Sequence, residues 1–166
     1  DNSRLTIVNL PTLEKAGARA FASCTFLEEI YLDALTELGA EAFSGATLLN
    51  EISCNRLQRV GAGAFYGTAI TEIYLPAELS YLEEMAFYGA EKLTAVNVSA
   101  NCEKYFSEDG VVYMRNEGNY VTLVSYPNGK TEKKYTAKDR TLKVGAFAFA
   151  GNSHLEEVTL PPHLQI

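Results

Sequence analysis

The dipeptide Ala-Phe recurs along this chain at a fixed interval of 22 residues. A regular interval of this length is typical of proteins built from stacked coils, because one short unit cannot bury its own apolar side chains. A doubly wound sheet also alternates strands with other segments, but its βαβ unit needs about 30 residues or more. The repeat therefore predicts a solenoid. The first four copies place phenylalanine at Phe21, Phe43, Phe65 and Phe87, and a fifth places it at Phe149.

The residues around each phenylalanine repeat as well. A short run that alternates apolar and polar residues follows each copy, as expected for a strand with one buried face. The segment Gly-x-x-Ala-Phe has the length of one helical or 3₁₀ turn, and small residues suited to a tight turn follow it. We expect the five phenylalanines to form one column in the core. The alternating runs are residues 5–10, 27–32, 49–54, 73–75, 93–98 and 155–160.

The interval between Phe87 and Phe149 is 62 residues, which exceeds one period by 40. Two β-prone runs, 111–114 and 120–124, flank the polar segment 115–119, which predicts a hairpin. The run Val124-Ser-Tyr126-Pro127 is similar to the strand end Ile73-Tyr-Leu75-Pro76, and Tyr135-Thr-Ala137 is so more weakly. We therefore expect two altered coils, one with the hairpin.

The predicted organisation is a single solenoid domain over residues 1–166. Regular repeats cover 1–98 and 142–166, and variant repeats with the hairpin cover 99–141. The chain opens on a strand-type run and stops at Leu164-Gln-Ile166, inside a unit. Because open solenoid ends normally need capping units, we expect a fragment of a longer protein.

The pattern Leu-x-x-Ile-x-Leu-Pro, followed by Leu-x-x-Leu-Gly-x-x-Ala-Phe-x-Gly, resembles the BspA-type leucine-rich repeats of bacterial cell-surface proteins. The resemblance covers nearly the whole chain. It implies an α/β, β-rich, right-handed and horseshoe-like solenoid with a parallel concave sheet, short helical or 3₁₀ turns and one β-hairpin insertion. It also implies an extracellular or cell-surface location, and attachment and recognition in place of catalysis.

Composition and residue spacing exclude several other functions. The formal net charge is -7, so nucleic acid would be repelled. The apolar stretches are far shorter than the roughly 20 residues of a membrane span. We expect no cofactor, metal or catalytic group, and we place both histidines, His154 and His163, at the surface. Three cysteines without close spacing, Cys24, Cys54 and Cys102, are expected to be buried free thiols.

One surface stands out for binding. Between the inward positions of each strand, every second side chain points outward, onto the predicted concave face. Adjacent strands lie about 4.8 Å apart, so tyrosines two units apart, Tyr31 and Tyr74, would be separated by roughly 10 Å. We refer to the following residues as the concave face: Glu29, Tyr31, Asp33, Glu51, Ser53, Asn55, Glu72, Tyr74 and Asn97.

Two functional hypotheses follow from this face. Tyrosines flanked by carboxylates and amides suit a basic protein segment or a sugar, which favours a non-enzymatic recognition or adhesion module. Its partner would be a protein or glycan of a host or neighbouring cell, with the hairpin residues 115–119 as a further contact. The alternative is a purely structural solenoid spacer within a larger surface protein, in which exposed Tyr and Glu merely favour strand formation and solubility.

Overall fold

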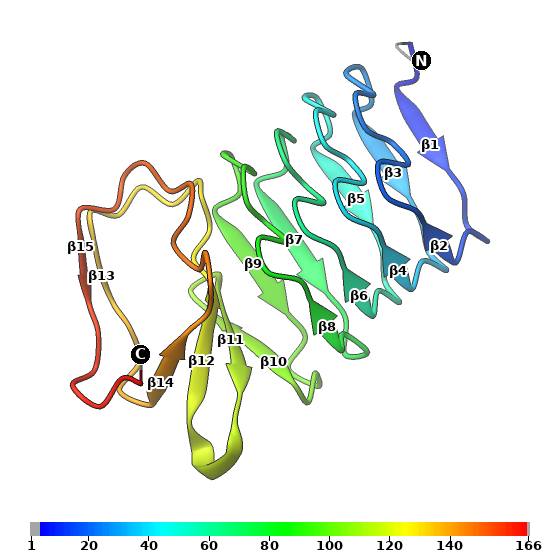
Figure 1. Cartoon of the computed structure of the whole chain (residues 1–166). Coiled ribbons are helices and arrows are strands. Elements are labelled where there is room, and N and C mark those ends of the chain that lie inside the picture. Colours follow the sequence, from blue (N-terminus) through cyan, green and yellow to red (C-terminus); the bar gives the residue numbers. More distant parts are fainter. Residues whose placement is uncertain (1–3, 166) are drawn as a thin grey trace.

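The computed structural model describes residues 4–165 as a stack of coils that runs from one end of the molecule to the other (Figure 1). Each regular coil contributes two short strands, one to each of two rows. The first row contains β1 (Ile7–Asn9), β3 (Glu29–Tyr31), β5 (Glu51–Ser53), β7 (Glu72–Leu75) and β9 (Ala95–Val98), and the second contains β2 (Lys15–Ala16), β4 (Glu37–Leu38), β6 (Arg59–Val60) and β8 (Tyr81–Leu82).

The strands of both rows pair in parallel and in register with the sequence repeat. Val8 lies opposite Ile30, and Ile30 lies opposite Ile52, so partners are one 22-residue period apart. In the second row, Leu38 pairs in the same way with Ala16 and with Val60. This register places equivalent apolar side chains above one another and confirms the predicted solenoid.

The Gly-x-x-Ala-Phe segments form turns instead of the helical turns that we expected. Around Phe43, both Glu41 and Gly45 have left-handed backbone, with φ of 54° and 76°. The Phe43 N–H donates across to Ala64 of the next coil at 2.9 Å, whereas the Ser44 N–H donates within its own coil to Glu41 at 2.9 Å. A helix needs successive right-handed residues and internal hydrogen bonds, so the fold is β-rich with almost no helix. Positive φ recurs at the same two positions of the other coils, at Arg19 and Ser23, Gly63 and Gly67, Met85 and Gly89, and Phe147 and Gly151.

Four of the five repeat phenylalanines form the expected column. The rings of Phe21, Phe43, Phe65 and Phe87 stack with successive centroid distances of 5.4, 6.0 and 5.7 Å. Phe149 does not join them and packs 5.7 Å from the ring of Tyr126. The reason is that Tyr126 takes the phenylalanine position of the preceding coil: its N–H donates to Ala148, as the Phe43 N–H donates to Ala64. The prediction of a single column of five rings was therefore wrong.

The insertion is larger than one hairpin. Strands β11 (Val111–Arg115) and β12 (Val121–Ser125) pair antiparallel around a short 3₁₀ helix, η1 (Glu117–Asn119), which confirms the predicted hairpin. A preceding strand, β10 (Tyr105–Glu108), also pairs antiparallel with β11. Its turn consists of Asp109 and Gly110, both with positive φ, the conformation of a two-residue hairpin loop. The insertion is thus a three-stranded meander.

The coil stack resumes after the meander. Strand β12 pairs in parallel with β14 (Thr141–Val144), and β13 (Lys134–Thr136) pairs in parallel with β15 (Glu157–Thr159). Tyr135 lies opposite the inward Val158, so Tyr135-Thr-Ala137 is a strand end as predicted. The run Val124-Ser-Tyr126-Pro127 was expected to match the strand end Ile73-Tyr-Leu75-Pro76. This prediction was wrong, because Tyr126 occupies the phenylalanine position.

The first row of strands is not continuous. It divides into β1-β3-β5 and β7-β9, and no pairing joins β5 to β7 within residues 4–165. Ile52 follows Gly45 by seven positions, whereas Ile73 follows Gly67 by six. The coil that leads into β7 is therefore one residue shorter, which displaces β7 from the register of β5.

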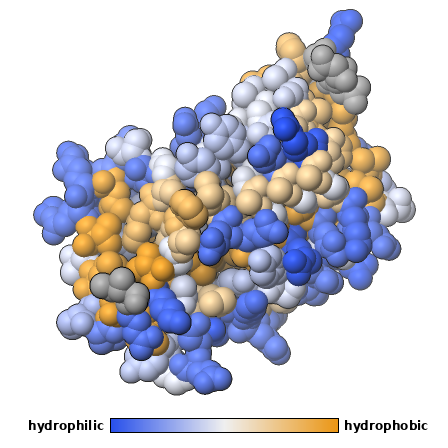
Figure 2. All heavy atoms as spheres, viewed as in Figure 1, coloured by the Kyte–Doolittle hydropathy of each residue, from blue (hydrophilic) through white to orange (hydrophobic). Residues whose placement is uncertain are grey.

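The core consists of two adjoining apolar clusters. The larger one contains the phenylalanine column and the buried, free thiols of Cys24, Cys54 and Cys102, as predicted. The smaller one surrounds Tyr126 and includes residues of the meander and the last coils. Ile7 in the first coil and Leu160 in the last one are exposed apolar residues. Hydrophobic side chains are visible on the surface toward both ends of the stack (Figure 2). Ile166, where the expected truncated unit stops, lies outside the described residues.

Candidate functional site

The structure divides the nine concave-face residues into two groups, one on each side of the interruption between β5 and β7. The first group lies on β3 and β5 and the residues that follow these strands, and the second lies on β7 and β9. The estimate of roughly 10 Å between Tyr31 and Tyr74 assumed a continuous sheet. It does not apply, because the two tyrosines lie on separate sheets.

Tyr31 is the centre of the first group. Its hydroxyl donates to the Glu29 carboxylate at 2.7 Å and lies 3.2 Å from the Glu51 carboxylate on the neighbouring strand. The hydrogen bond to Glu29, reinforced by desolvation and by both negative charges, raises the pKa of Tyr31 from 10.0 to about 12. The phenol is thus held as a neutral donor between two carboxylates.

A polar row continues this group beyond the ends of the strands. Ser53 Oγ donates to Asp33 Oδ1 at 3.0 Å, and Asn55 Nδ2 donates to Ser53 Oγ at 3.2 Å. Asp33 and Asn55 remain exposed. The row leads from the Tyr31 group to the edge of the interruption, where Asn55 lies.

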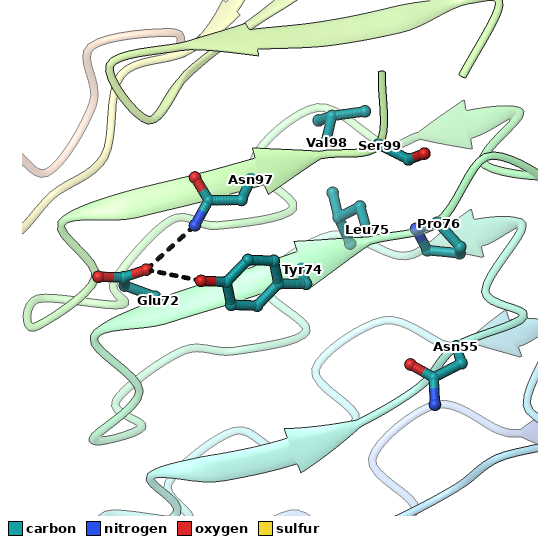
Figure 3. Close-up of a pocket in the computed structure, with 8 residues that line it drawn as sticks. All are labelled: Asn55, Glu72, Tyr74, Leu75, Pro76, Asn97, Val98 and Ser99. Atoms are coloured by element: carbon teal, nitrogen blue, oxygen red, sulfur yellow. Dashed lines mark hydrogen bonds between the residues drawn. The ribbon is translucent and has the colours of Figure 1, made fainter. Parts of the chain in front are cut away.

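Glu72 organises the second group (Figure 3). Its Oε2 atom accepts hydrogen bonds from Asn97 Nδ2 at 3.1 Å and from the Tyr74 hydroxyl at 3.4 Å. Tyr74 is nonetheless 72% exposed, more than any other large apolar or aromatic side chain in residues 4–165. A carboxylate, an amide and an open aromatic ring therefore lie together on two adjacent strands.

An open hollow of about 580 Å³ lies at this place. Four of its lining residues belong to the concave face: Asn55, Glu72, Tyr74 and Asn97. Sequence reasoning did not predict the hollow, because it depends on the missing pairing between β5 and β7. The signal in the sequence was the coil that is one residue short. The remaining lining residues are Leu75, Pro76, Val98 and Ser99.

The charge of this face is uncompensated. Glu29, Asp33, Glu51 and Glu72 form no ion pair with any described residue, since the six ion pairs of residues 4–165 all involve other carboxylates. No lysine, arginine or histidine lines the hollow. The face therefore presents a negative potential toward solvent, which attracts cationic groups.

The His, Cys, Asp and Glu side chains of residues 4–165 are the groups that could bind a metal or act in catalysis. No group of three or more His, Cys, Asp or Glu side chains could hold a metal ion there. His154 and His163 are exposed, as predicted. Burial raises the pKa of Cys54 to about 12, so this thiol is not activated as a nucleophile. Among the described residues there is also no helix that could cross a bilayer.

Comparison with solved structures identifies the fold. A leucine-rich repeat protein from Eubacterium ventriosum superposes with a TM-score of 0.76 at 21% identity, over 99% of this chain and 50% of that protein. The pneumococcal vaccine antigen PcpA gives 0.74 at 21% identity, over 96% and 46%. A leucine-rich cell surface protein from Faecalibacterium prausnitzii gives 0.52 at 18% identity, over 96% and 62%. The chain thus spans about half the length of the first two.

Sequence comparison gives the family. A search of curated proteins finds no match. The family model described as BspA type leucine rich repeat region matches residues 14–108 in six copies, which is more than half of the chain. The chain belongs to the BspA-type leucine-rich repeat family.

Proposed function

We propose that this domain is a recognition or adhesion module that binds a protein or glycan outside the cell through its concave face. The observation that carries the proposal is Tyr74, whose ring is 72% exposed beside the 580 Å³ hollow while its hydroxyl is oriented by Glu72. An exposed aromatic ring that is already oriented loses little conformational entropy on binding.

The chemistry of the face defines what it can bind. Tyr74 offers an apolar ring face, Glu72 offers acceptors and Asn97 offers a donor and an acceptor. The carboxylates of the Tyr31 group extend the same negative surface. Such a surface suits lysine and arginine side chains of a protein, or the hydroxyl groups of a sugar whose ring stacks on tyrosine.

The proposed location rests on the family and its solved relatives. One of these is a leucine-rich cell surface protein, and another is a vaccine antigen of pneumococcus. Leucine-rich repeat domains present side chains on extended sheets in place of an enclosed catalytic pocket, which agrees with the open hollow observed here. A non-enzymatic role at the cell surface is therefore part of the proposal.

The test is a binding screen of the domain against arrayed glycans and basic peptides, followed by titration of each ligand found. Tyr74→Ala should weaken binding by about 30-fold, the effect of a central contact residue. Tyr31→Ala combined with Tyr74→Ala should abolish binding, and both variants should unfold near the wild-type Tm. Tyr88→Ala is the matched control, since Tyr88 is an exposed tyrosine outside the concave face.

Two results would overturn the proposal. Undiminished affinity in the double variant would move the binding site elsewhere. The absence of any ligand in a broad screen would favour the structural spacer.

A further inference from the structure

The hairpin β11–β12 projects from the coil stack (Figure 1). A second hollow lies against this hairpin. It measures about 230 Å³, and none of the concave-face residues lines it. Side chains come from β10, from the hairpin β11–β12 and from the segment before β14. The residues that matter for its chemistry are Phe106, Arg115, Asn116, Asn119, Tyr120 and Arg140.

The charge of this hollow is opposite to that of the whole chain. Among residues 4–165, Arg115 and Arg140 are the only charged residues that line it, although the chain carries a formal charge of -7. Glu117 and Asp139 are close in sequence, but neither lines the hollow. A local positive site on a negative protein selects a small anionic group, because a large polyanion would meet the surrounding negative charge.

Both arginines are held in place by the protein. One terminal nitrogen of Arg115 donates to the carbonyl groups of Cys102 at 2.8 Å and Tyr105 at 2.5 Å, and its guanidinium lies 4.8 Å from the Phe106 ring centre. Arg140 donates through one terminal nitrogen to Asn119 Oδ1. These bonds use one nitrogen of each group, and residues 4–165 provide no side-chain carboxylate for the others. A planar guanidinium held in this way can bind a carboxylate through two parallel N–H donors.

Aromatic and amide groups surround the two charges. The Tyr120 ring is 42% exposed, and its contact with the ring of His163, at a centroid distance of 6.0 Å, is edge-on. The exposed part of this ring is available for stacking. Asn116 and Asn119 add amide groups that can bind hydroxyls. The hollow is smaller than the roughly 300–1,000 Å³ of a drug-sized site, so it fits one sugar residue.

We infer that this hollow binds a single carboxylate-bearing sugar residue, such as a uronic acid, within a glycan. The carboxylate would lie against Arg140 and Arg115, and the sugar ring would stack on Tyr120. The site is independent of the concave face, because the two hollows share no lining residue.

The experiment is a titration of the domain, observed by NMR, with methyl glucuronide, with methyl glucoside and with inorganic phosphate. Methyl glucuronide should bind, and the neutral glucoside and phosphate should bind at least about ten-fold more weakly. Arg140→Gln should reduce glucuronide binding by about ten-fold or more, and Arg140→Lys should not restore it fully, because lysine lacks the paired donors. Tyr120→Ala should weaken glucuronide binding and leave phosphate unaffected.

Lys15→Gln is the matched control, since it removes one positive charge on β2, far along the chain. Equal losses in Lys15→Gln and Arg140→Gln would show unspecific attraction and overturn the inference. Equal binding of glucuronide and glucoside would overturn the role of the arginines, and phosphate binding as tight as that of glucuronide would overturn the role of the sugar ring. Tyr74→Ala should leave glucuronide binding unchanged, which separates this test from that of the concave face.

Discussion

The phenylalanine column makes a quantitative prediction about Phe65. Its side chain is fully buried, and its ring stacks between Phe43 at 6.0 Å and Phe87 at 5.7 Å. Phe65→Ala removes the buried ring and leaves a cavity that the neighbouring coils cannot fill, which costs about 3–5 kcal/mol. For a chain of this size each kcal/mol lowers the Tm by about 2–4 °C, so the expected decrease in Tm is about 6–20 °C.

Phe21→Ala is the comparison variant. Phe21 is half-buried at the end of the column and stacks on one ring only, at 5.4 Å. Its removal leaves no enclosed cavity, so we expect about 1–2 kcal/mol. Phe65→Leu keeps most of the apolar volume, so its loss of stability should be less than half of the loss in Phe65→Ala.

The assay is thermal and urea unfolding followed by circular dichroism, with amide hydrogen exchange as a local readout. In Phe65→Ala, exchange should accelerate first in β3 to β8, because each coil contacts only its neighbours. A loss for Phe65→Ala no larger than that for Phe21→Ala would refute the reasoning, since it would mean that the stacked rings do not carry the core.

Three further predictions concern single positions. Glu41 has left-handed backbone where the next coil has Gly63, so Glu41→Gly should raise the free energy of unfolding by about 0.5–1 kcal/mol. The control Ala42→Gly should lower the free energy of unfolding, and both variants are measured by urea denaturation. Tyr31 should titrate near pH 12 in ultraviolet absorbance, and a titration near pH 10 would contradict the prediction. Because the pKa of Tyr31 is raised in the folded state, the stability that it contributes is complete below the unfolded pKa of about 10 and is lost as the pH rises toward 12. Tyr31→Phe should remove this pH dependence of stability. Tyr126 OH is buried without a hydrogen-bond partner, so Tyr126→Phe should be neutral or stabilising, whereas a loss above about 1 kcal/mol in thermal unfolding would show an unseen partner.

The fold was predictable from sequence wherever the repeat is regular. The interval from Phe21 to Phe87 and the alternation of inward residues such as Ile30 and Ile52 depend on neighbours within one coil and on the next copy of the same coil. The free cysteines and the exposed histidines follow from the same local pattern. The β11–β12 hairpin was also predictable, because its turn residues are adjacent in sequence.

Prediction failed where an aromatic residue changed identity or a coil changed length. Tyr126 takes the place of a phenylalanine, so a search for Ala-Phe cannot find that coil. The prediction of helical turns was wrong because it depended on the length of the Gly-x-x-Ala-Phe segment alone. Only the hydrogen bonds to the next coil select left-handed backbone at two positions four residues apart, as at Glu41 and Gly45.

The alternation along each strand predicts which residues belong to the concave face, but it does not predict which of them contact one another. Alternation determines that the side chains of Glu72 and Tyr74 point outward from the same strand. It does not determine that Glu72 binds Asn97 on β9, nor that a hollow opens beside Asn55. The hydrogen bond depends on the pairing of β7 with β9, and the hollow lies beside the interruption between β5 and β7.

The sequence by itself determined that this chain stacks coils of one template, and it determined which side chains face inward, because period and alternation are properties of each short segment. The tertiary structure alone decided where the sheet is interrupted, which rings complete the second cluster and where the two hollows lie. Those outcomes depend on how each coil packs on the one before it, because a shift of one residue between two coils interrupts the first row of strands while the second row stays paired.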